Sequence, residues 1–363
     1  MRGPIAVAGA LALVAAGLLA AGPEAPPKSP APRRPARATV DVIFDTDMAL
    51  DVDDVGALAL LHALADKGEC QILAIGVSES VRAYDGQWAP AAADAIDTYY
   101  GRPEIPVGVY RGPHQEMNEK GRYAEKVATS FPHRLKSGAG APSAFKLYRR
   151  VLAGRPDHSV VMISVGFLTN LADLLASAPD DLSPADGVEL VRNKVKAWVC
   201  MGGRYPQAEQ GEFNFATYPE ATAEVLARWP TPVTFSGGEL GEKVMTGARL
   251  LKKFDPAKNP VARAYREFTE GKDRNSWDQT AALFAVRGLA FQGQTYFTAV
   301  TQGYNRFELA VGPPGQRGPQ PSHNTWMPDP DSDQSYLVAA MPPAALARVI
   351  EDLMMQAPAR RRR

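Results

Sequence analysis

The chain has 363 residues, of which 45% are hydrophobic and 22% charged, a composition typical of a globular protein with a large core. Its 40 basic residues balance its 40 acidic residues, so no overall positive charge exists to hold a nucleic-acid backbone. The five histidines and two cysteines, Cys70 and Cys200, do not have the spacing of a zinc site. We therefore expect a small-molecule partner and no nucleic acid.

The two ends of the chain do not have the composition of a folded core. Arg2 precedes an apolar run over 5–21, so residues 1–22 are predicted to be a signal peptide or an N-terminal anchor. Residues 23–38 form a Pro-rich linker, and 358–363 form a basic tail. We expect export, periplasmic or secreted, with no stable membrane association if the leader is cleaved. Residues 39–357 remain for one domain.

From residue 39 onward, apolar runs of strand length alternate with helical patterns. The runs predict strands at 40–44, 72–77, 105–110, 160–165, 196–201 and 232–235. Helices are expected at 53–67, 89–100, 168–178, 219–228 and 276–289. This alternation indicates a Rossmann-like α/β fold, with a mostly parallel central sheet and helices on both faces. Site residues are expected directly after strands, because ligands bind beyond the strands' carboxyl ends.

Five carboxylates follow the first predicted strand within ten residues: Asp45, Asp47, Asp51, Asp53 and Asp54. Crowded carboxylates repel one another, and a hard divalent cation with oxygen ligands relieves that repulsion. One or two aspartates could instead cap the following helix, but capping does not account for Asp45 and Asp47 at the strand end. The Gly and closing Glu of an EF-hand are missing. The cluster favours a metal site in an irregular loop.

The segment from Val42 to Asp47, followed by Asp53-Asp54 at a helix start, resembles the N-terminal signature of the inosine-uridine preferring nucleoside hydrolase family. The spacing is two residues longer than usual, and the extra residues make Asp51 an additional carboxylate. A branch of nucleoside hydrolase-like bacterial proteins has this variant. The resemblance implies the nucleoside hydrolase fold.

Two further segments match the family in order. Gly166 to Ala172 is similar to the segment in which a threonine carbonyl ligates calcium, which places Thr169 in that role. Met201-Gly202-Gly203 and Glu212-Phe213-Asn214 are similar to segments that bind ribose. A second ribose-binding Asn of the family is not found over 204–211, and Ser78-Glu79-Ser80 occupies the region of another.

The last match is Asn275 to Thr280, where the family places a calcium-binding Asp, here Asp278. The residue before it, often a His that protonates the leaving base, is Trp277. This change resembles the purine-preferring members, in which an indole stacks on the base. Tyr84 and Trp88 follow the second predicted strand and offer a second stacking face.

Together, these matches imply a calcium-dependent N-glycosidase that cuts ribonucleosides into base and ribose, with a suspected purine preference. Asp47 would be the general base that activates a metal-bound water. Asp45 and Asp51 would support the ligands or begin the helix. The implied calcium ligands are Asp47, Asp54, Thr169 and Asp278, and the implied substrate-binding residues are Asp53, Met201, Glu212, Phe213, Asn214 and Trp277.

Three alternatives stay open. The chain could be a non-catalytic, calcium-dependent riboside-binding protein of the same fold, or a hydrolase of another N-riboside. A haloacid-dehalogenase-type phosphatase also has a strand ending in Asp-x-Asp, but the tight group of Asp51, Asp53 and Asp54 fits that chemistry poorly. Homo-oligomerisation stays open too, because the sequence reveals no interface.

Overall fold

The computed structural model describes residues 1, 3, 38–115, 122–313, 316 and 318–359. Nearly all of the predicted leader and of the linker therefore lies outside the described residues, as does most of the basic tail. Contacts divide the chain into residues 1–37 and a compact unit formed by residues 38–363. Among the described residues, no helix combines the length and apolarity needed to cross a membrane.

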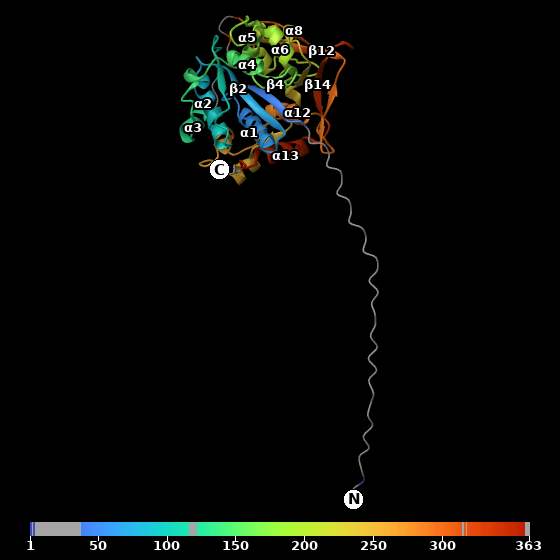
Figure 1. The fold of residues 1–363 in the computed structure, drawn as a ribbon. Coiled ribbons are helices and arrows are strands. Elements are labelled where there is room, and N and C mark those ends of the chain that lie inside the picture. The colour runs from blue at the N-terminus through green and yellow to red at the C-terminus, as the bar shows by residue number, and fades with distance from the viewer. Residues whose placement is uncertain (2, 4–37, 116–121, 314–315, 317, 360–363) are drawn as a thin grey trace. The chain divides into compact units, whose positions relative to one another are not determined.

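The compact unit is built on one eight-stranded sheet with the order β11-β14-β6-β5-β4-β1-β2-β3 (Figure 1). All neighbouring strands are parallel except the edge pair of β11 and β14. The sheet strands are β1 (Val40–Thr46), β2 (Cys70–Ser80), β3 (Val107–Tyr110), β4 (Val160–Ser164), β5 (Val195–Met201), β6 (Val233–Ser236), β11 (Phe297–Val300) and β14 (Gln334–Ala339). Three small two-stranded sheets contain β7 (Met245–Thr246), β8 (Arg274–Asn275), β9 (Ala290–Phe291), β10 (Gln294–Thr295), β12 (Gly303–Glu308) and β13 (His323–Pro328).

Helices cover both faces of the sheet. On one face lie helices of the first and last thirds of the chain, α1 (Asp53–Asp66), α2 (Tyr84–Tyr99), α3 (Tyr123–Ser130), α11 (Pro260–Thr269), α12 (Trp277–Arg287) and α13 (Pro343–Met354). On the other lie α4 (Ala144–Ala153), α5 (Thr169–Ala176), α6 (Gly187–Lys194) and α8 (Pro219–Arg228), which Figure 1 shows together above the sheet. Shorter helices are η1 (Gly138–Gly140), α7 (Phe213–Thr217), α9 (Gly238–Gly241) and α10 (Ala248–Lys253).

Two hydrophobic cores lie on opposite faces of the sheet because side chains alternate along each strand. In β1, Val42 and Phe44 join the core under α1 and α12, whereas Ile43 joins the core under α4 and α5. In β5, Val199 and Trp198 divide in the same way. Strands buried on both faces read as continuous apolar runs, and these runs made the strands recognisable in the sequence.

The fold class is confirmed: the sheet is mostly parallel and helices lie on both of its faces. Helix α2 begins at Tyr84, five positions before the predicted start, and holds Pro90 in its interior. The antiparallel strand β11 and the β12–β13 hairpin were not predicted, because their exposed positions interrupt the apolar pattern. Cys70 and Cys200 are both free and buried.

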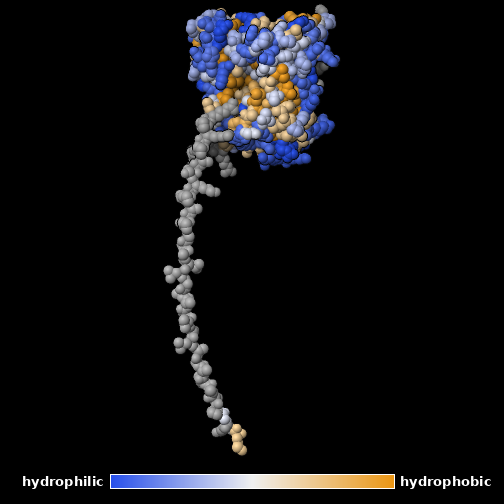
Figure 2. Space-filling view, turned by 90° about the vertical axis from the view of Figure 1, so that its right-hand side faces the viewer, coloured by the Kyte–Doolittle hydropathy of each residue, from blue (hydrophilic) through white to orange (hydrophobic). Residues whose placement is uncertain are grey.

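The sheet edge near β14 is partly apolar. Figure 2 faces this side of the molecule and shows apolar side chains gathered between hydrophilic rims. Val338 of β14 and Tyr304 of β12 are among the exposed large apolar residues. The charged cluster lies elsewhere, at the carboxyl ends of the central parallel strands.

Candidate active site

A cavity of about 860 Å³ lies at the carboxyl ends of β1, β4 and β5, within the size range of small-molecule sites. Its walls come from loops that follow these strands and from the start of α12. The lining residues include Asp47, Leu50, Asp51, Asp53, Asp54, Val165, Met201, Arg204, Gln207, Gln210, Glu212, Phe213, Asn214, Phe268, Arg274, Trp277 and Asp278.

The acidic loop after β1 is held in an irregular conformation by a buried tyrosine. Ala49 has a φ of 100°, in the region that favours glycine, and its backbone N donates to the Tyr123 hydroxyl at 2.7 Å. The same hydroxyl donates to the Asp51 carbonyl at 2.5 Å. Met48 and Val52 are fully buried and anchor the loop in the core. This bracing fixes the directions in which the aspartates of the loop point.

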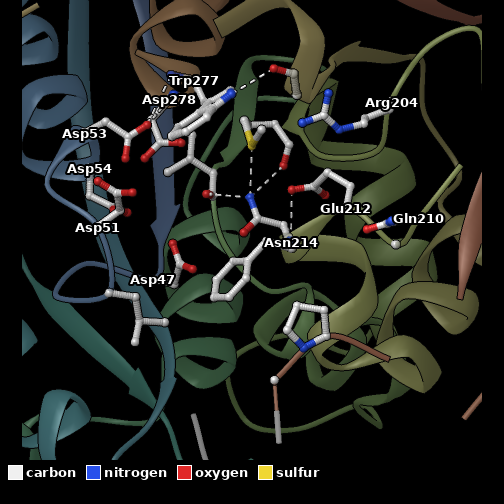
Figure 3. Close-up of a pocket in the computed structure, with 18 of the residues that line it drawn as sticks. Asp47, Asp51, Asp53, Asp54, Arg204, Gln210, Glu212, Asn214, Trp277 and Asp278 are labelled. Carbon is white, nitrogen blue, oxygen red and sulfur yellow. Dashed lines mark hydrogen bonds between the residues drawn. The ribbon is translucent and has the colours of Figure 1, made fainter. Parts of the chain in front are cut away.

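Asp53, Asp54 and Asp278 meet at the cavity wall, and one carboxylate oxygen of each lies within 4.8 Å of the others (Figure 3). All three side chains are buried. Asp53 Oδ2 accepts hydrogen bonds from the backbone N of Trp277 at 3.1 Å and of Asp278 at 3.2 Å. The Thr46 hydroxyl donates to Asp54 Oδ1. The start of α1 is thereby joined to the start of α12.

The electrostatics of this group fit a cation. Burial, and then the neighbouring carboxylates, raise the pKa of Asp53, Asp54 and Asp278 well above the usual value. Among the described residues, no Lys, Arg or His lies within ion-pair distance of these three side chains; the nearby Arg274 is paired with Asp51. Buried carboxylates without a counter-charge are costly, and an all-oxygen donor set suits a hard divalent ion. The residues present therefore fit the metal that the sequence predicted.

Asp47 lies in the same cavity but outside the group of three (Figure 3). Its side chain is 5% exposed, and burial followed by the charge of Asp53 raises its pKa well above the usual value. A carboxylate with a raised pKa and access to the cavity suits proton transfer. Asp47, predicted as both ligand and base, therefore lies outside the group of three carboxylates. Asp53, predicted to contact the sugar, belongs to that group.

Asp45, a predicted supporting residue, and Thr169, a predicted calcium ligand, both bind other groups through their side chains. Asp45 is fully buried, accepts from Asn170 Nδ2 at 2.9 Å and from the Tyr148 hydroxyl, and burial raises its pKa to about 7. Thr169, the predicted carbonyl ligand, opens α5 and donates through Oγ1 to the Ser78 carbonyl at 2.9 Å. Neither is among the described residues that line the cavity.

The predicted ribose-binding residues come together at the end of β5. Asn214 Nδ2 donates to the Val165 carbonyl at 2.9 Å and the Met201 carbonyl at 3.2 Å, so its amide oxygen is turned toward the side where Asp47 lies (Figure 3). Glu212 accepts from the backbone N of Gly203 at 2.9 Å and of Asn214 at 3.0 Å. Glu212 therefore shapes the loop as well as lining the cavity.

Two glutamines lie in the segment 204–211, where the sequence has no counterpart of the family's second ribose-binding Asn. Gln207 and Gln210 both line the cavity, as does Phe213, whose side chain is 41% exposed. Sequence reasoning missed the two glutamines because it searched that segment only for Asn. A polyol needs several converging donors and acceptors, and an amide of either length supplies both.

Trp277 forms the wall beside the carboxylate group. Its indole Nε1 donates to the Gly238 carbonyl at 2.8 Å, which fixes the plane of the ring. The guanidinium of Arg274 lies over the ring, 5.1 Å from Cζ to the ring centroid. Sequence reasoning also missed Arg274 and Arg204, which line the cavity, because single arginines in loops have no distinguishing spacing.

The suggested second stacking face is not present in the cavity wall. Tyr84 donates through its hydroxyl to Glu125, and Trp88 packs against the hydrophobic core beneath α1 and α2. Neither is among the described residues that line the cavity. The longer α2 accounts for both positions, because it draws 84–88 into a helix instead of a loop.

The model of a family described as inosine-uridine preferring nucleoside hydrolase matches residues 42–327. No curated protein sequence matches the chain. The matched range contains every residue placed in the cavity wall above.

Solved structures with similar folds have low sequence identity to the chain. A purine-preferring ribonucleoside hydrolase from Gardnerella vaginalis is 18% identical with a TM-score of 0.61, over 87% of this chain and 99% of that one. A plant nucleoside hydrolase is 17% identical with a TM-score of 0.59, over 87% and 99%. A type III effector protein, XopQ, solved with adenosine diphosphate ribose, is 15% identical with a TM-score of 0.60, over 89% and 95%. These likenesses show the shared fold.

Proposed function

Because the chain belongs to the inosine-uridine preferring nucleoside hydrolase family, we propose that it hydrolyses purine ribonucleosides in a calcium-dependent reaction. Membership of a metal-dependent family makes it a hydrolase of N-glycosidic bonds, with a small-molecule nucleoside as substrate. Calcium and the purine preference are the proposed part. The observation that supports them is the buried group of Asp53, Asp54 and Asp278 beside the indole of Trp277.

Asp53, Asp54 and Asp278 would hold the cation, and Asp47 lies within the same cavity wall. Calcium suits the loop better than magnesium because it tolerates irregular oxygen geometry, whereas magnesium demands a near-ideal octahedron. When bound, the ion supplies positive charge that orients sugar hydroxyls and makes a nearby water more acidic.

In the chemical step, Asp47 removes a proton from a water that attacks the anomeric carbon of the ribose. A C–O bond forms as the C–N bond to the base breaks, and the base leaves with a proton. Asn214 and Glu212 line the cavity beyond the end of β5, where they would orient a sugar held against Met201. Holding the ribose in one orientation lowers the entropic part of the barrier.

The indole of Trp277 takes the position in which members of the family often have a His that protonates the leaving base. An aromatic wall suits a purine, whose two fused rings offer more stacking area than a pyrimidine. Stacking would then favour a protonated purine as the leaving group without a side-chain acid.

The test is release of free ribose from inosine, guanosine, uridine and cytidine, with calcium and again with a chelator. We expect ribose to be released faster from inosine and guanosine than from uridine and cytidine. We also expect the chelator to abolish this release. Release that is unchanged by the chelator would contradict the calcium requirement, and equal rates on all four would contradict the purine preference. No release from any of them, with calcium still bound, would favour another N-riboside or a riboside-binding protein.

Export is proposed from the apolar N-terminal run alone. Expression of the full chain in a bacterial host, followed by fractionation and N-terminal sequencing, tests it. A chain that stays in the cytoplasm with Met1 intact would contradict it.

A further inference from the structure

Asp51 and Trp277, two of the departures from the family pattern, are connected in space by one arginine. Arg274 Nε donates to Asp51 Oδ1 at 3.0 Å and Oδ2 at 3.1 Å, and Arg274 Nη2 also donates to Oδ2. The same guanidinium lies over the Trp277 ring at 5.1 Å and over the Phe268 ring at 5.6 Å. All four residues line the cavity. The extra carboxylate therefore has a partner other than the predicted metal.

The contacts around Trp277 leave its ring little freedom. Asp53 holds its backbone N, and the Gly238 carbonyl holds its indole N–H. Gly241 lies so close that an added Cβ would stand 2.3 Å from the Trp277 Cα. With Arg274 over one face of the indole, a base can stack only on the other face.

The role of Arg274 is geometric more than electrostatic. Asp51 neutralises its charge through a two-pronged contact, so the pair adds little net charge to the cavity. A planar guanidinium in such a fork has a fixed orientation and stacks on aromatic rings, which a lysine ammonium does not do. Asp51 and Arg274 are 223 residues apart in sequence. Their contact therefore lets the acidic loop also fix the cavity wall at Trp277, against which the base would stack.

We propose that Asp51 and Arg274 are positioning residues that hold Trp277 for stacking and thereby set the preference for the leaving base. The proposal rests on the proposed function, because it needs a riboside bound in this cavity. It assigns the additional aspartate to base selection and not to the metal.

The experiment compares Asp51→Asn, Arg274→Gln, the double variant and Arg274→Lys, with inosine, uridine and 4-nitrophenyl riboside as substrates. The last leaves as 4-nitrophenolate without protonation, and its single ring offers less stacking area than a purine, so it reports mainly the ribose and metal machinery. Arg306→Gln is the matched control, because it removes an arginine from an exposed pair with Glu308 on β12. Circular dichroism checks that each variant is folded, and Asp51→Glu replaces any Asp51 variant that is not.

Each single variant should lower kcat/KM for inosine about tenfold, mostly by raising KM. A tenfold change corresponds to the loss of one contact of about 1.4 kcal/mol. The double variant should lose no more than the worse single variant, because both act through one unit. Arg274→Lys should lose as much as Arg274→Gln. Hydrolysis of 4-nitrophenyl riboside, and all activities of Arg306→Gln, should stay within about twofold of wild type.

Calcium affinity, measured by calorimetry, separates this role from metal ligation. Asp51→Asn removes a negative charge near the carboxylates and Arg274→Gln removes a positive one, so the two should shift calcium affinity in opposite directions. Their effects on inosine should nevertheless have the same sign. A loss of calcium binding in Asp51→Asn as large as in Asp54→Asn would overturn the proposal.

Three other results would also overturn it: additive losses in the double variant, equal losses on inosine and 4-nitrophenyl riboside, or full activity in Arg274→Lys. Failure of the proposed function looks different, because the wild-type protein would then release no base. In that case inosine binding, measured by calorimetry on the same variants, replaces kcat/KM, and the same non-additive pattern is required.

Discussion

Asp47 and the group of Asp53, Asp54 and Asp278 are close in sequence and space, yet the structure gives them different surroundings. Asp47 faces the cavity without belonging to the three-carboxylate group. Asp47→Asn should therefore lower kcat by about 10² or more, in line with the loss of a general base, and keep calcium affinity within about tenfold. Asp278→Asn should lose calcium binding and activity together. Ribose release and calcium calorimetry on both variants check this, and near-wild-type turnover in Asp47→Asn would contradict the assignment.

Glu79, fully buried at the end of β2, gives the folded protein a pH dependence. Burial raises its pKa to about 8, from a reference value of 4.5. Between these values the folded state keeps a proton that the unfolded state has lost, so stability falls as pH rises through this window. The slope approaches about 1.4 kcal/mol per pH unit.

Glu79→Gln should remove this dependence. Urea unfolding at pH 5 and pH 8, with a chelator present, should show wild type losing more stability than the variant over the interval. His114→Gln is a suitable control, since it removes the neighbouring ring at 3.4 Å and leaves the carboxyl in place. Parallel pH profiles for wild type and Glu79→Gln would show that Glu79 does not titrate in this range.

At the scale of single residues, the sequence located the acidic loop and Trp277 but not their partners. Five aspartates after a strand are visible as a pattern, whereas the pairing of Asp51 with Arg274 depends on packing between distant segments. The assignment of Glu212 to ribose also missed its hydrogen bonds to backbone amides, because a capping role needs the local backbone conformation.

At the scale of helices and strands, Glu351 of α13 caps a different helix. Its Oε1 accepts from the backbone N of Gly247 at 3.0 Å, Arg249 at 2.9 Å and Leu250 at 3.2 Å, at the start of α10. Glu351→Ala should lower the free energy of unfolding by about 2 kcal/mol, because buried N–H groups lose their acceptor. Glu224→Ala, in an exposed pair with Arg228, should stay within about 0.5 kcal/mol. Urea unfolding measures both, and equal effects would contradict the capping role.

The elements themselves were largely predictable where both faces are buried. The central strands and α8 follow from their apolar patterns, and α8 has the predicted bounds. The predicted start of α2 placed Pro90 in the first helical turn, where proline is tolerated, but the helix begins at Tyr84 and holds Pro90 in its interior. Only Phe297 is buried among the four residues of the edge strand β11, so its apolar pattern was too short to recognise.

At the scale of the whole molecule, cation binding by Asp53, Asp54 and Asp278 should raise the free energy of unfolding. A cation that binds only the folded state stabilises it by about 2.7 kcal/mol at a hundred times its dissociation constant. Calcium should therefore raise the unfolding temperature, and a chelator should lower it. Magnesium at equal concentration should act more weakly, and Asp278→Asn should show no calcium response. Identical unfolding temperatures with calcium and with chelator would contradict a calcium site in this group.

The hydrogen bonds that the backbone N–H groups of Trp277 and Asp278 donate to Asp53 span 224 and 225 residues of sequence. Contacts between such distant segments cannot form until most of the chain has been made and packed. The carboxylates of the first loop must therefore remain without their third member throughout most of synthesis. A nascent or truncated chain that ends before residue 278 should therefore be inactive however well its first half folds, so activity would report that synthesis has passed this residue.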